Sequence, residues 1–376
     1  MPKYKFGDLV YNITEKATPV AGDEELYIGL EHLDSGSLRV TRWGSKVALK
    51  GDKLKMREGD ILFGRRNTYL RRVAIAPHDG LFSAHGMIFR AKTERIDPDY
   101  LPFFLASDCF MEEAIRISVG SLSPTVNWKE LKELEFTIPD LETQHKNAQT
   151  LLAANDLKEK YEELLAVTDD LVKSQFIELF GDPVTNSQNL KAEPLSKHLS
   201  VTGGFAFRST DFNTEKGIPV LRIGNINSGE FLPVNMVYWP YDESLSRYFC
   251  KPGDLVISLT GTVGKDDYAN ICCLGNEYEL YYLNQRNAKL TLKETVLPEY
   301  ITVLLANNSV KAILTNAGQG VRQANISNSD ILNLVVPIPD IDRQNTFAKI
   351  VKQTDKSKYC KQNHVFSMTR GGERCA

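Results

Sequence analysis

The sequence lacks the hydrophobic runs that mark membrane and exported proteins. Nowhere do about 20 apolar residues follow one another, so we expect no membrane-spanning helix. The N-terminal residues Met1–Phe6 lack the apolar core of a signal peptide. We therefore expect the chain to remain in the cytoplasm.

Cysteine and histidine are sparse, with six of each in 376 residues. No two cysteines have the CxxC spacing of a zinc ribbon, and the histidines show no metal-ligand spacing. In a reducing compartment such cysteines act as small hydrophobic residues. The sequence thus predicts no metal site.

Signatures of catalysis are missing as well. The chain has no phosphate loop of the GxxxxGK type, no GxGxxG, no HExxH and no aromatic Pro-Pro tetrapeptide of an amino-methyltransferase. Pro139-Asp140 resembles a nuclease motif, but the pair reappears as Pro339-Asp340, each time just before a predicted helix, which favours helix capping. We therefore expect a recognition protein with no catalytic site and no cofactor of its own.

Neither sign of charge dominates, because 45 Lys and Arg stand against 48 Asp and Glu, for a net charge of −3. This balance argues against a nonspecific polyanion binder. It is compatible with nucleic-acid binding through basic residues on one face, with partners supplying part of the phosphate neutralisation.

The sequence does contain a long internal repeat. The segment Pro98–Gln144 aligns without a gap on Pro298–Gln344, a shift of 200 residues. Upstream, with small gaps, Gly59-Asp60 pairs with Gly253-Asp254. A long period that occurs twice predicts two copies of one domain, not a solenoid of short units.

Each copy mixes short strands with a helical segment. β-branched and aromatic residues bounded by Gly, Asp and Asn predict strands at 25–29, 59–63, 87–90 and 134–138, and again at 219–223, 254–258 and 334–338. One-sided apolar patterns predict helices at 100–117 and 300–315. The mixture predicts α+β domains, each with a small twisted sheet.

A long amphipathic helix follows the first copy. Residues 141 to about 180 contain no proline or glycine, and apolar residues recur there at spacings of three and four, among them Ala154, Leu157, Tyr161, Leu164 and Leu171. Asp140 is placed as the N-cap, and Gly181 begins a breaker. A second helix starts in the same way after Asp340, but its apolar pattern fades beyond Val351.

These patterns predict five segments: a first domain at 1–140, a central helix at 141–181, a second domain at 182–340, a short C-terminal helix at 341–366 and a tail at 367–376. We expect the two helices to pair as an antiparallel coiled coil, which would relate the two domains by a pseudo-two-fold axis. The alternative is a plain linker between the domains.

Recognition candidates lie in loops at equivalent places of the two copies. In the first copy, the loop at 64–72 interleaves four arginines with polar and aromatic residues, which suits phosphate and guanine contacts; the alternative is a solvated basic turn. The candidates are Arg65, Arg66, Asn67, Thr68, Tyr69, Arg71 and Arg72, with Ser121 and Ser123 of a second loop.

The second copy carries different residues in these loops. Its candidates are Thr260, Thr262 and Lys265 after the Gly-Asp strand, and Gln319, Arg322, Gln323 and Asn325 in the second loop, where amide and guanidinium groups suit adenine and guanine edges. Phe207 and Arg208 form a third candidate, although the aromatic residues there are equally suited to the core. Because the framework repeats while the loops differ, the sequence predicts two domains that read two different short sequences.

This combination resembles the specificity subunits of type I restriction–modification systems over nearly the whole chain. The resemblance rests on two copies that each end in Ile-Pro-Asp before a helix with Gln144 or Gln344, and on the two Gly-Asp strands. Further support comes from Gly203–Phe207, Gly261–Gly264 and the helix end Lys173–Pro183. The order and duplication of these motifs are specific, whereas no single motif is decisive.

The resemblance implies a non-catalytic subunit whose domains each read one half of a split, asymmetric site in double-stranded DNA. It implies that the helices set the spacer and dock two adenine-N6 methyltransferase subunits, with the stripe at Leu157, Tyr161, Leu164 and Leu171 as the docking surface. Restriction subunits would join this assembly. S-adenosylmethionine, ATP and Mg²⁺ would belong to these partners.

Other functions stay open at this level. An enzyme with its own DNA-reading domain would bind a metal or S-adenosylmethionine, and a structural protein would join partners through its helices without DNA. The short C-terminal helix leaves open a further alternative. In this alternative the chain is a degenerate specificity subunit, and methyltransferase docking is weakened at that end.

Overall fold

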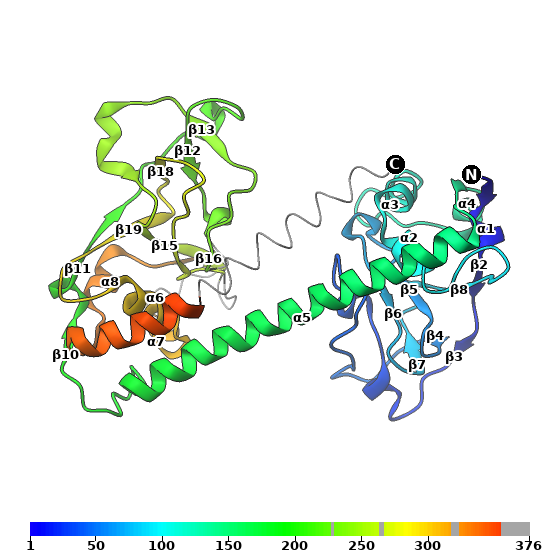
Figure 1. Cartoon of the computed structure of the whole chain (residues 1–376), viewed down its shortest axis with the longest axis horizontal. Coiled ribbons are helices and arrows are strands. Elements are labelled where there is room, and N and C mark those ends of the chain that lie inside the picture. Colours follow the sequence, from blue (N-terminus) through cyan, green and yellow to red (C-terminus); the bar gives the residue numbers. More distant parts are fainter. Residues whose placement is uncertain (227–228, 263–266, 317–322, 355–376) are drawn as a thin grey trace. The chain divides into compact units, whose positions relative to one another are not determined.

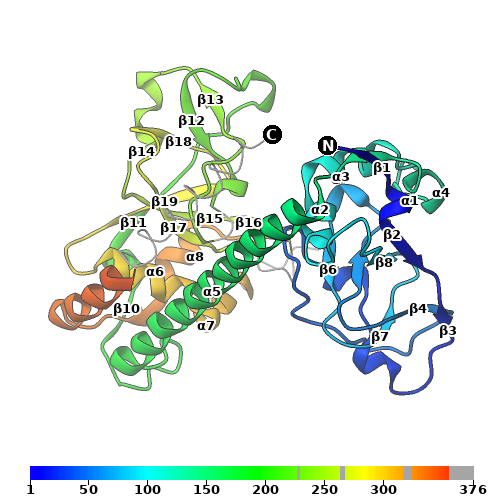
Figure 2. The ribbon, with the colours of Figure 1, turned by 45° about the vertical axis from the view of Figure 1, so that its right-hand side comes forward.

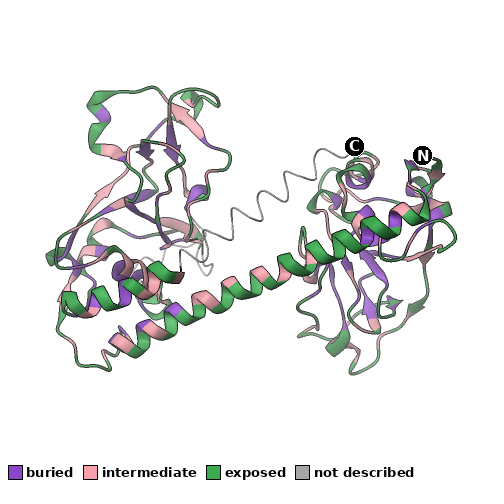
Figure 3. Cartoon of the chain, in the orientation of Figure 1, coloured by how far each residue is buried: buried purple, intermediate pink, exposed green. Residues whose placement is uncertain are grey.

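The computed structural model describes residues 1–226, 229–262, 267–316 and 323–354. Contacts divide the chain into two compact units, Met1–Lys160 and Tyr161–Ala376, called unit 1 and unit 2 (Figure 1). Each unit has a buried core of its own (Figure 3). The boundary falls inside the central helix, so each unit takes part of it. The predicted tail at 367–376 and residues 355–366 of the predicted C-terminal helix lie outside the described residues.

Unit 1 is built on a four-stranded antiparallel sheet with the strand order β2-β8-β5-β6. Its strands are β2 (Val10–Ile13), β5 (Ile61–Phe63), β6 (Val73–Ile75) and β8 (Met87–Ala91). The unit also contains a three-stranded sheet of β3 (Lys16–Ala17), β4 (Lys53–Met56) and β7 (Gly80–Phe82), and β1 (Lys3–Lys5) paired with β9 (Glu135–Thr137). The helices are α1 (Phe6–Leu9), α2 (Leu101–Ala106), α3 (Asp108–Arg116) and α4 (Trp128–Leu131), with 3₁₀ turns at Asp23–Leu26, Leu30–His32 and Thr68–Leu70.

Alternation along β5 explains why this sheet has a core on both faces. Ile61 and Phe63 point into the cluster formed with α2, α3 and α4, whereas Leu62 points into the cluster with β4 and β7. Successive side chains of a strand face opposite sides of the sheet, so a run of three apolar residues must be covered on both sides.

Unit 2 repeats this plan. Its main sheet has the order β11-β19-β15-β17, from β11 (Leu199–Gly203), β15 (Leu255–Ser258), β17 (Ile271–Cys273) and β19 (Asn287–Leu292). The second sheet contains β12 (Ile218–Leu221), β13 (Val237–Trp239), β14 (Phe249–Cys250) and β18 (Tyr281–Leu283), and two strand pairs join β10 (Ala192–Pro194) to β21 (Val335–Pro337) and β16 (Thr260–Thr262) to β20 (Gln323–Asn325). The helices are α6 (Pro298–Ala306), α7 (Asn308–Asn316) and α8 (Asn328–Asn333), with 3₁₀ turns at Leu195–Lys197, Ser209–Asp211, Ile223–Asn225 and Glu243–Tyr248.

The strand registers confirm the predicted duplication. Ile61 pairs with Phe89 in unit 1, and its counterpart Leu255 pairs with Leu290 in unit 2. Each of these strands follows a Gly-Asp turn whose glycine, Gly59 or Gly253, has φ near +85° (+82° and +87°). A side chain is disfavoured in that conformation, which explains why glycine occurs there in both copies.

Three sequence-based predictions were wrong in detail. The helices expected at 100–117 and 300–315 are each two helices, because Ser107 and Asn307 interrupt them and accept hydrogen bonds from backbone N–H groups of the next turn. The strand expected at 25–29 is a 3₁₀ turn followed by a single bridge from Ile28 to Phe82. The acidic run beginning at Asp23 favours this turn, since the Asp23 carboxylate accepts a hydrogen bond from the Val20 N–H at 2.9 Å.

The central helix α5 (Leu141–Phe180) starts where predicted and ends one residue before the predicted bound at 181. Asp140 caps its start by accepting the Thr143 N–H at 2.9 Å, and this amide, followed by the Thr143 hydroxyl, lowers the pKa of Asp140 below its usual value. Asp340 accepts the Arg343 N–H at 2.9 Å at the start of the helical residues 341–354. Gly181 ends α5 with φ +76°. Both caps are therefore confirmed.

Buried residues at the end of α5 belong to unit 2. Phe176 and Phe180 pack on Tyr300 and on Phe347, with ring centroids between 5.0 and 5.6 Å apart. Residues 341–354 run antiparallel to these last turns of α5 (Figure 1). This packing is consistent with the predicted coiled coil, although the buried positions differ from the predicted stripe.

A buried glutamine anchors the start of α5 in unit 1, and another anchors the start of the helical residues 341–354 in unit 2. The Gln144 carboxamide accepts the Asp97 N–H at 2.8 Å and donates to the carbonyls of Arg95 and Pro139 at 3.1 and 2.8 Å. Figure 2 shows the first turns of α5 beside α2. Gln344 makes the same three contacts in unit 2, with the Leu297 N–H and the carbonyls of Thr295 and Pro339. We call each such arrangement a glutamine clasp.

We predict that Gln144→Ala destabilises unit 1 and that Gln344→Ala destabilises unit 2, each by about 1–3 kcal/mol, because truncation removes three hydrogen bonds made by a buried side chain. Hydrogen-exchange mass spectrometry resolves the two units, so each substitution should raise exchange in its own unit. Gln149→Ala, at an exposed position of the same helix, is the control. Equal changes from Gln149→Ala would contradict a specific role for the clasp.

Candidate nucleic-acid interface

In unit 1 the arginine loop, residues 64–72, is joined to a second loop, residues 119–127. Arg66 and Thr125 form an antiparallel bridge. The Asn67 N–H donates to the Pro124 carbonyl at 2.7 Å, and the Val126 N–H donates to the Arg65 carbonyl at 3.0 Å. The two loops predicted separately from the sequence therefore form one surface beyond the end of β5.

Several predicted contact residues are exposed on this surface. Arg66 and Tyr69 are exposed, as is Ser121, while Arg65 and Asn67 are half-buried. The Arg66 guanidinium donates to the Ser123 hydroxyl at 3.2 Å, across the two loops. Guanidinium, hydroxyl and phenol groups are the chemistry that contacts phosphates and base edges.

Other residues of the arginine loop hold it together. Thr68 is 1% exposed and donates its hydroxyl to the Arg65 carbonyl at 2.9 Å. Arg72 donates to the carbonyls of Leu30 and Arg66 at 2.9 and 3.0 Å, and burial lowers the pKa of its guanidinium. Thr68 and Arg72 thus support the loop in this fold, and their assignment as DNA contacts stays a prediction.

Arg71 is less exposed than Arg66 and less buried than Thr68. It pairs with Asp108 of α3 at 2.5 Å, and both side chains remain partly exposed. Its backbone has φ +50°, and that of Asn67 has φ +55°, so left-handed residues flank the 3₁₀ turn Thr68–Leu70 on both sides. Asparagine tolerates this conformation better than arginine does. The surrounding contacts therefore impose the shape of the loop.

Unit 2 joins its two loops through the same backbone contacts. Thr260 pairs with Asn325 in the β16–β20 ladder, and the Ile326 N–H donates to the Leu259 carbonyl at 2.8 Å. These contacts match Arg66–Thr125 and Val126–Arg65 in unit 1. The two units thus present the same pair of loops with different side chains.

The remaining predicted residues of unit 2 have varied positions. Thr262 donates its N–H and its hydroxyl to Asp267 at 2.7 and 2.8 Å, and Gln323 pairs through its backbone with Thr262. Arg208 is exposed, whereas Phe207 is 7% exposed and packs on Tyr282 and Trp239, so its role is in the core. Lys265, Gln319 and Arg322 lie outside the described residues.

The duplicated loop pair is matched by a comparison with known families. A family model described as the type I restriction modification DNA specificity domain matches this chain twice, at residues 5–165 and 199–363. The chain belongs to this specificity family. Each match covers one copy of the repeat.

Individual members of the specificity family agree with this assignment. The specificity subunit of the type I restriction enzyme MjaVIII from Methanocaldococcus jannaschii is 23% identical over 370 residues, covering 93% of this chain and 85% of the relative. The EcoBI specificity subunit from Escherichia coli is 27% identical over 173 residues, covering 42% of this chain and 32% of that subunit. A solved type I restriction-modification S subunit from M. genitalium has the same fold, with a TM-score of 0.57, 13% identity, and coverage of 98% of this chain and 92% of that chain.

In this specificity chain the predicted stripe of α5 faces solvent. Leu157, Leu164 and Leu171 are between 39% and 49% exposed, and Tyr161 is half-buried. Their spacing of seven residues places the three leucines along one side of the helix. No helix among the described residues combines the length and hydrophobicity of a membrane span.

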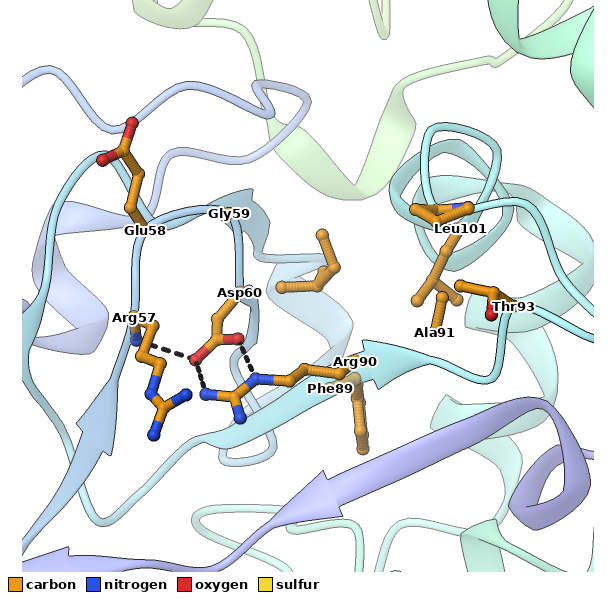
Figure 4. A pocket seen from close by; sticks show the side chains of 11 residues that line it. Arg57, Glu58, Gly59, Asp60, Phe89, Arg90, Ala91, Thr93 and Leu101 are labelled. Atoms are coloured by element: carbon orange, nitrogen blue, oxygen red, sulfur yellow. Dashed lines mark hydrogen bonds and ion pairs between the residues drawn. The ribbon is translucent and has the colours of Figure 1, made fainter.

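The Gly-Asp turn of unit 1 lines a cavity of about 360 Å³ (Figure 4). Asp60 is buried there and accepts hydrogen bonds from the Arg57 N–H at 2.8 Å and from the Arg90 guanidinium at 2.5 and 2.9 Å. Asp254 accepts the Lys251 N–H at 2.9 Å in unit 2. These aspartates close the turn at the start of β5 and β15, at the opposite strand end from the recognition loops.

Sequence reasoning passed over Leu122, which lies between the two predicted serines. It is 95% exposed at the end of the second loop of unit 1. An isolated leucine carries no sequence signal that separates a surface residue from a core residue, so only the structure identifies it.

We predict that Arg66→Ala weakens DNA binding by the assembled complex several-fold and lowers the slope of affinity against salt by about one, as expected for a lost phosphate contact. Arg72→Ala should instead lower the melting temperature, because its hydrogen bonds hold the loop. Binding titrations at several salt concentrations, with melting curves, separate the two effects. Arg57→Ala, at an exposed position before β5, is the control, and equal behaviour of Arg66→Ala and Arg72→Ala would refute the division of roles.

Proposed function

We propose that this chain is the DNA-reading subunit of a type I restriction–modification complex, with no catalytic site of its own. Unit 1 reads one half of a bipartite, asymmetric site in double-stranded DNA, and unit 2 reads the other half. The observation that carries the proposal is the loop pair, which has the same backbone contacts in both units and different side chains in each.

The side chains favour different half-sites. Arg66 in unit 1 suits a guanine edge or a phosphate, whereas Asn325 at the end of the unit 2 ladder suits an adenine edge. Since the framework beneath the loops is shared, these differences act on recognition and leave the fold unchanged. Two such units on one chain match a site with two unlike halves.

The helices provide the spacing and the partner surface in this proposal. The 40 residues of α5 extend about 60 Å at 1.5 Å per residue. The exposed leucine stripe docks methyltransferase subunits, two in each complex, and restriction subunits complete the assembly. S-adenosylmethionine, ATP and Mg²⁺ are held by these partners, and the complex works in the cytoplasm.

The deciding experiment maps N6-methyladenine in a host that expresses this chain with its methyltransferase subunit. Single-molecule sequencing should find one split motif with a fixed gap, methylated only when both proteins are present. A continuous motif, or methylation that does not require this chain, would refute the proposal.

We predict that loop substitutions affect one half of that motif at a time. Arg66→Ala with Ser123→Ala should relax base preference in one half, and Thr260→Ala with Asn325→Ala should relax it in the other, because each pair lies in one unit. The same mapping of N6-methyladenine by single-molecule sequencing is carried out for both variants. Relaxation of both halves by either pair would contradict independent reading.

We predict that Leu164→Asp abolishes methyltransferase assembly without unfolding the chain, because a charge placed on the exposed stripe must be desolvated in the complex. Native mass spectrometry counts the bound subunits, and circular dichroism checks the fold. Glu163→Asp, at the neighbouring exposed position, is the control. Normal assembly of Leu164→Asp would exclude the stripe as the docking surface.

A further inference from the structure

The second loop of unit 1 ends in a short, tightly held hairpin. Val119 and Thr125 exchange both backbone hydrogen bonds, at 3.1 and 2.9 Å. The Thr125 hydroxyl donates to the Ser123 carbonyl at 2.9 Å, and Gly120 provides φ +114° for the turn. The end of this loop is therefore fixed by local contacts.

Leu122 stands at the end of this hairpin and is 95% exposed. Its neighbours Gly120, Ser121, Ser123 and Pro124 are residues that favour turns, and leucine is not. Single exposed apolar residues are common on protein surfaces and need no explanation by themselves. Leu122 differs from other exposed apolar residues in its position, because its hairpin is joined to the arginine loop.

Polar groups surround this leucine on the same surface. The Arg66 guanidinium reaches the Ser123 hydroxyl, and the bridge from Arg66 to Thr125 holds the base of the hairpin against the arginine loop. An exposed apolar group on the same loop surface as hydroxyls and a guanidinium matches the mixed chemistry of a base edge in the major groove. There the thymine C5-methyl is the one apolar group among hydrogen-bond donors and acceptors.

We propose that Leu122 contacts the C5-methyl of a thymine in the half-site read by unit 1. The proposal rests on the proposed function and names one base contact within it. Arg66 and the neighbouring serine hydroxyls bind the adjacent phosphates or base edges, and Leu122 discriminates thymine from cytosine at one position.

The repeat supports a reading role for this position. The gap-free alignment places Leu122 opposite Arg322, which lies outside the described residues. Leucine suits a methyl group and arginine suits guanine, so the two copies carry different base chemistry at one place.

The experiment uses the full chain assembled with its methyltransferase subunit and a duplex that carries the mapped site. Each thymine of the unit 1 half-site is replaced in turn by uracil, which removes only the C5-methyl. One replacement should weaken binding by the wild-type complex about fourfold, the value of one buried methyl group. The same replacement should have no effect on the Leu122→Ala complex, whose binding to the thymine duplex is already weakened.

The ratio of thymine to uracil affinity within each variant does not depend on how much of that variant is folded. Val119→Ala, at the exposed base of the same hairpin, is the matched control and should keep the wild-type ratio. Uracil in the unit 2 half-site should affect wild type and Leu122→Ala equally.

Two results would overturn the proposal: equal uracil effects in wild type and Leu122→Ala, or a unit 1 half-site without any A·T pair. Failure of the proposed function looks different, because the wild-type complex would then bind the mapped duplex no better than a scrambled one.

Discussion

The structure of each unit depends on one buried carboxamide, that of Gln144 or Gln344. Each clasp binds a backbone N–H and two carbonyls through one buried side chain. Because the clasp joins the first turn of α5 or of residues 341–354 to the segment before α2 or α6, it fixes where that helix starts on its unit. The recognition loops lie beyond the other end of the sheet strands. The loops can therefore change sequence without disturbing the helix junction.

The two parts of α5 are attached to their units by different chemistry. In unit 1, Lys158 donates to the Gly36 carbonyl at 2.9 Å, and Arg39 lies 3.8 Å from Glu159. Surface polar contacts such as these contribute little to stability, so the clasp is the main polar anchor. In unit 2, Phe176 and Phe180 are buried among aromatic rings, where apolar burial is the stabilising contribution. The end of α5 is thus part of the core of unit 2, whereas the middle of α5 contacts unit 1 through polar groups at the surface.

The sequence was sufficient for features set by periodicity and local chemistry. The extent of α5 and the caps at Asp140 and Asp340 follow from patterns that act within a few residues, and the duplicated sheet follows from the repeat at a shift of 200 residues. It was insufficient where distant contacts decide. Phe176 and Phe180 lie off the predicted stripe and are buried only because Tyr300 and Phe347 cover them. Phe207 and Leu122 are both apolar loop residues, yet one is in the core and the other is exposed, and no local signal separates them.

The arginine loop shows why residue type alone overstates the charge available to DNA. Arg72 is occupied by two carbonyls, Arg71 is paired with Asp108, and Arg65 is half-buried, so Arg66 presents most of the positive charge. Affinity from phosphate contacts scales with the number of cations that reach the backbone. A chain with net charge −3 and so few accessible arginines in this loop gains little nonspecific affinity from it. Contacts outside this loop must then supply the rest, which suits a chain of the DNA specificity family.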